Sequence, residues 1–74
     1  MATKVTDPRK TLGQAIRKVR LARGLTQEQL AEKADLHWTY VSGIERGIRN
    51  VSIMNLFNIA VALRVRVKDL VKNL

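Results

Sequence analysis

The feature that most constrains the fold of this chain is an apolar pair that recurs at the predicted helix starts. One apolar residue stands just before a cap position and a second follows five residues later, the spacing of a hydrophobic staple. The pairs are Leu25 and Leu30, Leu36 and Val41, Val51 and Leu56, and Val65 and Leu70. Apolar residues also recur at intervals of three and four, and no segment alternates as a strand would. The sequence therefore predicts an all-α fold.

Five helices are expected, and several of their ends are marked by capping residues. Thr26 and Gln29 have the spacing of a capping box, and Ser52 is a strong N-cap. Gly24 and Gly47 stand where a left-handed residue is favoured after a helix. A chain of 74 residues allows one small domain. We expect it over residues 10–74, preceded by a flexible N-terminal arm over residues 1–9.

The charge balance is strongly basic, with 14 Lys and Arg against 6 Asp and Glu and a formal net charge of +8. A small domain with such a charge is expected to bind a polyanion. Composition alone leaves nucleic acid, membrane lipid and a merely solvated surface open. A membrane-surface peptide is disfavoured because the predicted helices have tight caps and mutually compatible apolar faces.

The residue types that carry catalysis or bind metals are scarce. The chain has no cysteine, and His37 is the only histidine, so neither a metal site nor an activated nucleophile is predicted. No cofactor motif occurs, and we expect neither an enzyme nor a small-molecule ligand. The first residues lack the apolar run of a signal peptide, and no apolar stretch approaches the roughly 20 residues that span a bilayer. A cytoplasmic protein is expected.

The second and third predicted helices are short, and only the few residues ADLH join them. Two short helices with so tight a turn are typical of a helix-turn-helix, whose second helix enters the DNA major groove. A plain helical hairpin is the alternative. Gly43 lies inside the third helix, where it costs about 1 kcal/mol relative to alanine. Another helix or a ligand is therefore expected to approach the backbone closely there.

The run LTQEQLAEKADLHWTYVSGIERGIRN resembles the helix-turn-helix of the phage-repressor class (Cro/cI, Xre). With the first helix, LGQAIRKVRLARG, the resemblance covers about residues 11 to 71. Within the class, TYVSGIERGIRN is most similar to the controller proteins of restriction–modification systems. The resemblance implies a homodimer that binds a palindromic or pseudopalindromic double-stranded operator and regulates its own and the endonuclease gene. If the protein also activates transcription, RNA polymerase is a further partner.

The resemblance and the residue types together give candidate DNA contacts. Those expected to meet bases or the groove are Trp38, Thr39, Ser42, Gly43 and Arg49. Those expected to meet phosphates are Gln27, Tyr40, Arg46, Asn50 and Ser52. Alternatives remain for several of them. For Trp38 the alternative is a place in the hydrophobic core, and for Tyr40 it is a lid over that core. For Arg49 the alternative is a phosphate contact, and for Ser52 it is the N-cap of the fourth helix.

Two structural roles complete the expectations. The resemblance implies an ion pair between Glu45 and Arg20 that fixes the third helix on the first. The candidate dimer interface comprises Leu63, Val65, Val67, Val71 and Leu74, which would otherwise close the core. Arg64 and Arg66 depart from the glycine and serine usual in the class. The alternative function is an antitoxin-type interaction module whose main partner is a protein.

Overall fold

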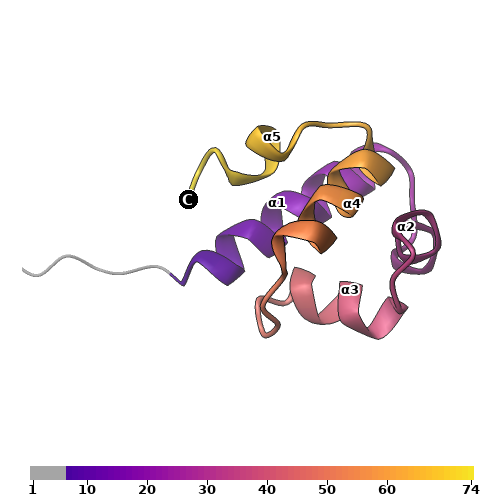
Figure 1. Cartoon of the computed structure of the whole chain (residues 1–74), viewed down its shortest axis with the longest axis horizontal. Coiled ribbons are helices and arrows are strands. Elements are labelled where there is room, and N and C mark those ends of the chain that lie inside the picture. Colours follow the sequence, from indigo (N-terminus) through magenta and orange to yellow (C-terminus); the bar gives the residue numbers. More distant parts are fainter. Residues whose placement is uncertain (1–6) are drawn as a thin grey trace, which may run out of the picture.

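The computed structural model describes residues 7–74, and this range contains five helices and no strand (Figure 1). The helices are α1 (Pro8–Ala22), α2 (Gln27–Ala34), α3 (Trp38–Glu45), α4 (Ile53–Leu63) and α5 (Val67–Val71). The predicted all-α fold of five helices is confirmed. In Figure 1, α1 and α4 lie at the centre, with α3 on one side of them and α5 on the other.

The first helix begins earlier than expected. Asp7 is its N-cap and accepts a hydrogen bond from the backbone N–H of Arg9 at 2.9 Å. Pro8 occupies the first helical position, where its missing N–H is no loss and its fixed φ suits a helix. Residues 8 and 9 therefore belong to α1, and assigning them to a flexible arm was wrong. The rest of that predicted arm, residues 1–6, lies outside the described residues.

The starts of α2 and α4 have the predicted caps, and α5 has one that was not predicted. Thr26 and Gln29 form the reciprocal capping box, with bonds of 3.0 Å and 2.8 Å. The Ser52 hydroxyl accepts from the backbone N–H of Asn55 at 3.1 Å. At α5 the backbone N–H of Arg66 donates to the Asp69 carboxylate at 3.0 Å. These local bonds satisfy N–H groups that a helix terminus otherwise leaves unpaired.

A left-handed residue follows each of the helices α1 to α4. Gly24 and Gly47 have φ of 72° and 75°, as the sequence predicts. Asp35 and Arg64 adopt the same region with φ of 58° and 61°. Arg64 thus takes the turn conformation without being a glycine. The neighbouring end of α4 is held by Arg23, whose Nε donates to the carbonyl of Leu63 at 2.8 Å.

The core gathers side chains from all five helices. Fully buried members are Ile16, Leu30, Val41, Ile44, Ile59, Leu63 and Leu70. Leu63 is therefore a core residue within one chain, and its assignment to a dimer interface was wrong. It lies on the inner face of α4, whereas Val65, Val67 and Val71 are half-buried and Leu74 is exposed.

Candidate nucleic-acid interface

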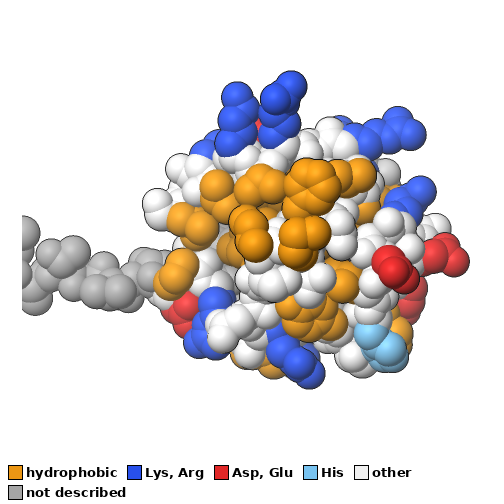
Figure 2. Space-filling model, in the orientation of Figure 1, with side chains coloured by type: hydrophobic (Ala, Val, Ile, Leu, Met, Phe, Trp, Pro, Cys, Tyr) orange, Lys and Arg blue, Asp and Glu red, His pale blue; other side chains and the backbone are white. Residues whose placement is uncertain are grey.

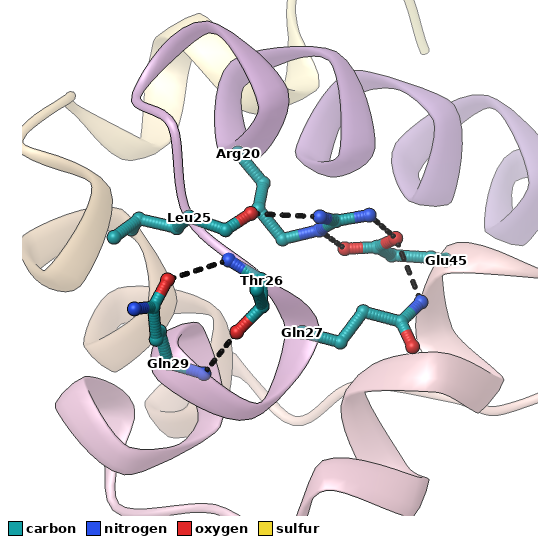
Figure 3. Close-up of polar contacts among 6 residues, drawn as sticks. All are labelled: Arg20, Leu25, Thr26, Gln27, Gln29 and Glu45. Atoms are coloured by element: carbon teal, nitrogen blue, oxygen red, sulfur yellow. Dashed lines mark hydrogen bonds and ion pairs between the residues drawn. The ribbon is translucent and has the colours of Figure 1, made fainter.

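The position of α3 is fixed by a buried ion pair with α1. Arg20 donates through Nε to Oε2 of Glu45 at 2.6 Å and through a terminal nitrogen to Oε1 at 2.9 Å (Figure 3). Arg20 is 7% exposed and Glu45 is 8% exposed. The hydrogen-bonded carboxylate raises the pKa of the Arg20 guanidinium. A third donor of Arg20 reaches the carbonyl of Leu25 at 2.8 Å, so the buried cation is well satisfied.

Gln27 joins this network from the start of α2. Its side-chain amide donates to Oε1 of Glu45 at 3.1 Å, so Glu45 connects α3 to both α1 and α2 (Figure 3). One amide N–H of Gln27 is therefore used within the protein. Its second amide N–H and its backbone N–H in the first turn of α2 remain suited to an anion, because that backbone group has no partner within the helix.

A second contact between α1 and α3 depends on Gly13, which sequence reasoning missed. A Cβ placed on Gly13 would overlap the carbonyl oxygen of Ile44 and lie 2.7 Å from that of Glu45. Only a glycine allows α1 to approach the last turn of α3 so closely. The available signal was a glycine inside a predicted helix, the same signal that singled out Gly43.

The first turn of α3 presents Trp38 and Thr39 to solvent. Trp38 is 48% exposed, which excludes a core role, and its ring lies against that of His37 with centroids 6.3 Å apart. Thr39 is exposed, and Ser42, one turn later, is half-buried. The backbone N–H of Thr39 donates to Nδ1 of His37 at 3.2 Å. His37 thus caps α3, although histidine is a poor cap residue in general.

Gly43 does not face open space. It is buried, and a Cβ there would lie 2.5 Å from Cγ of Arg49. The close approach at this glycine is made by the Arg49 side chain, whereas another helix or a ligand was predicted. The expectation that Gly43 itself lines the DNA surface was also wrong. The Arg49 guanidinium lies 5.9 Å from the centroid of the Tyr40 ring, where a cation is attracted to the ring face.

Tyr40 is engaged within the protein. Its hydroxyl donates to the carbonyl of Asn50 at 2.9 Å and accepts from the Asn55 amide at 3.3 Å. Because its single proton is used, Tyr40 cannot donate to a phosphate without breaking the bond to Asn50. Its half-buried ring packs against the core, as the alternative role predicted. The Ser52 hydroxyl is similarly used as the cap of α4.

The loop after α3 supplies exposed basic and amide groups. Arg46, Arg49 and the Asn50 side chain lie on the surface between α3 and α4. Basic side chains border the edge of the molecule where α3 lies, and others stand at the opposite edge (Figure 2). The positive charge is therefore spread over several faces. The net charge indicates a polyanion but does not by itself locate the surface that meets it.

A further exposed feature, which the sequence reasoning missed, lies on α4. Four large apolar residues of this helix are 54–70% exposed: Ile53, Met54, Phe57 and Val61. Hydrophobic side chains gather over α4 on the face shown in Figure 2. We call these four residues the α4 stripe. Contiguous exposed apolar surface on a small protein is typical of an interaction site.

A family model described as helix-turn-helix matches residues 16–70. The chain belongs to the helix-turn-helix family. This helix-turn-helix protein is 52% identical over 59 residues to control protein C.BamHI of Bacillus amyloliquefaciens, covering 78% of this chain and 73% of the relative. It is 41% identical over 64 residues to control protein C.SmaI of Serratia marcescens, covering 86% and 76% of the two chains.

A solved structure gives the same assignment. The restriction–modification controller protein C.AhdI from Aeromonas hydrophila matches this helix-turn-helix protein with a TM-score of 0.83 at 44% identity. The match covers 84% of this chain and 94% of that one. The protein is thus a helix-turn-helix regulator of the restriction–modification controller type, as its sequence resemblance predicted.

No helix in residues 7–74 is long and apolar enough to cross a membrane. Within the same range, no three His, Asp or Glu side chains are grouped as metal ligands would be.

Proposed function

We propose that this protein is a sequence-specific double-stranded DNA-binding transcription regulator that acts as a homodimer on a palindromic or pseudopalindromic operator. As a controller, it would regulate its own gene and that of an endonuclease. The observation that carries the proposal is the exposed first turn of α3, with Trp38 and Thr39 on a helix that Arg20 and Glu45 hold rigidly. An exposed tryptophan on a helix held by a buried ion pair is suited to pack against the wall of a groove.

The candidate contacts divide between bases and phosphates. Trp38, Thr39 and Ser42 lie at the N-terminal part of α3, which meets base edges when such a helix enters the major groove. Arg49 adds a cation beside that surface. Gln27, Arg46 and Asn50 are suited to phosphates, which position a protein on the duplex without reading its sequence.

The dimer is proposed to form through the α4 stripe, extended by the exposed parts of Val65, Val67, Val71 and Leu74. The earlier candidate Leu63 is excluded because it is buried within one chain. A single domain of this size reads only a few base pairs. A homodimer places two copies of α3 on half-sites about 34 Å, or one helical turn, apart.

Selection of bound duplexes from a random-sequence pool tests the function. Enrichment of a site with two symmetry-related halves about one turn apart would support a dimeric, sequence-specific regulator. Equal and weak binding to every duplex, with no enriched sequence, would instead favour the antitoxin-type module. In that alternative the α4 stripe would bind a different protein. Sedimentation equilibrium of the free protein separately measures whether it dimerises.

A further inference from the structure

The residue that caps α3 also contacts the side chain of a proposed base-contacting residue. Nδ1 of His37 lies 3.2 Å from the backbone nitrogen of Thr39 and 2.7 Å from its hydroxyl oxygen. Both contacts join the same ring nitrogen to the same residue. Together with the Trp38 ring, which lies against the imidazole at 26° between planes, they fix where the histidine stands.

The backbone contact indicates which tautomer of His37 is present. A backbone N–H can only donate, so Nδ1 must carry a lone pair to accept from Thr39. A neutral imidazole has one N–H, which is then on Nε2. Because Nδ1 has no proton to give, the short contact to Oγ1 requires the Thr39 hydroxyl to be the donor. In this tautomer the hydroxyl proton points at the histidine.

We propose that His37 is a positioning residue for sequence readout, a step that rests on the proposed DNA-binding function. A free threonine hydroxyl rotates and can donate or accept. With its proton held by His37, Thr39 offers DNA only oxygen lone pairs and its methyl group. In the major groove an acceptor matches the amino groups of adenine N6 and cytosine N4, and it opposes the oxygens of guanine O6 and thymine O4.

The acceptor character of Thr39 determines which base the operator should carry opposite it. At the base that Thr39 contacts in each half-site, the preferred base carries an amino group, and the preference over a keto base is roughly tenfold, the value of one good hydrogen bond. Removing the acceptor at residue 37 frees the hydroxyl and lowers that preference to roughly twofold. Other positions of the half-site keep their preferences, since they are read by other side chains.

The test compares base preferences at every position after selection from a random pool. The wild type, His37→Ala, His37→Asn and Thr39→Val are selected in parallel. Asparagine keeps a cap and an acceptor oxygen, so His37→Asn should retain the preference that His37→Ala loses. Thr39→Val lacks the hydroxyl and should also lose the preference for a base with an amino group. Because preferences are ratios within one protein sample, a lower folded fraction in a variant cancels.

The outcomes separate the two proposals. If the wild type selects no site, the proposed function fails and this inference fails with it. If the wild type selects a site but His37→Ala keeps every preference unchanged, only the role of His37 is overturned. A relaxed preference in His37→Asn equal to that in His37→Ala also overturns it, because a retained acceptor would then have no effect.

The proton placement has its own measurement on the free protein. Nitrogen-15 spectra of the imidazole distinguish a ring protonated at Nε2 from one protonated at Nδ1. The proposal requires Nε2–H at a pH where the ring is neutral. A ring protonated at Nδ1 would donate to Thr39 and overturn the inference without any DNA in the experiment.

Discussion

Arg20 of α1 and Glu45 of α3 meet in a two-point, buried ion pair across 25 residues of sequence. Each charge is removed from water and satisfied almost entirely by the other, with Leu25 and Gln27 completing the contacts. Such a pair need not add net stability relative to apolar side chains, because desolvation offsets much of the attraction. Its effect here is to set the position of the helix that presents Trp38 and Thr39.

Removing one partner should be far more damaging than removing both. Glu45→Ala leaves a buried guanidinium without its counter-ion and should lower the free energy of unfolding by about 3–5 kcal/mol. The double variant Arg20→Met with Glu45→Met should regain most of that loss. Urea titrations followed by circular dichroism measure both. A Glu45→Ala protein within 1 kcal/mol of the wild type, on the order of one ordinary hydrogen bond, would contradict the prediction.

Gly13→Ala should destabilise the protein although alanine is the better helix former. The added methyl would overlap the backbone of Ile44 and Glu45, which cannot move as a flexible side chain can. The expected loss is about 1–3 kcal/mol, the usual cost of overpacking. Gln14→Ala, at an exposed position of the same helix, is the matched control and should be neutral or slightly stabilising. Thermal unfolding of both variants checks the difference.

Arg64→Gly should stabilise the protein. Arg64 adopts a left-handed conformation with φ of 61°, which costs a residue with a Cβ about 1 kcal/mol and costs glycine little. Arg64→Ala removes the same charge but keeps the Cβ, so it should give no gain. Chemical denaturation of the pair separates the backbone effect from the charge effect. Equal stabilities for the two variants would show that the backbone conformation is not the cause.

Arg46→Ala should weaken binding to all duplexes to a similar extent. Loss of one phosphate contact reduces the slope of log affinity against log salt by about 1 while leaving base preferences unchanged. Lys68→Ala is the control, since Lys68 is also exposed but belongs to α5, on the other side of α1 from α3. Fluorescence anisotropy over a salt series measures both slopes. An altered base preference in Arg46→Ala would assign this residue to base readout instead.

Phe57→Glu should shift the protein from dimer to monomer. A carboxylate at the centre of the α4 stripe would be buried without a partner in the proposed interface, which is strongly unfavourable. Leu21→Glu changes an equally exposed apolar residue on α1, with 55% exposure against 54% for Phe57, and should leave the dimer intact. Sedimentation equilibrium distinguishes the two results. A dimer that survives Phe57→Glu would place the interface elsewhere.

The helix boundaries were predictable because their signals are local. Thr26, Gln29 and Ser52 act through bonds to their own helix, and Gly24 and Gly47 act through their own backbone. The exception is Pro8, where the basic residues that follow suggested an arm and the cap at Asp7 was overlooked. The Arg20–Glu45 pair followed from the family resemblance and not from spacing, since nothing in the sequence shows that two residues 25 apart will meet.

The exposed side of α4 and the surroundings of Gly43 could not be predicted in the same way. Apolar spacing in α4 predicts a buried face of Leu56, Ile59, Ala60 and Leu63, and these residues are the buried ones. Nothing in the spacing predicts the second set of apolar residues, such as Phe57, on the exposed side. Gly43 correctly indicated a close approach, but the sequence did not name the side chain that makes it. That required knowing how the loop returns Arg49 across α3. Tertiary contacts of this kind are set by packing between elements.

The close packing of Gly13 against the end of α3 affects how the protein can recognise DNA. With the α1 and α3 backbones in contact there, the recognition helix has little freedom to tilt or slide toward an imperfect half-site. Adjustment must then come from the duplex. We expect discrimination to extend to base pairs the protein never touches, because flexible pyrimidine–purine steps bend at lower cost than stiff A-tracts. The mechanical properties of the operator would thus be read along with its base edges.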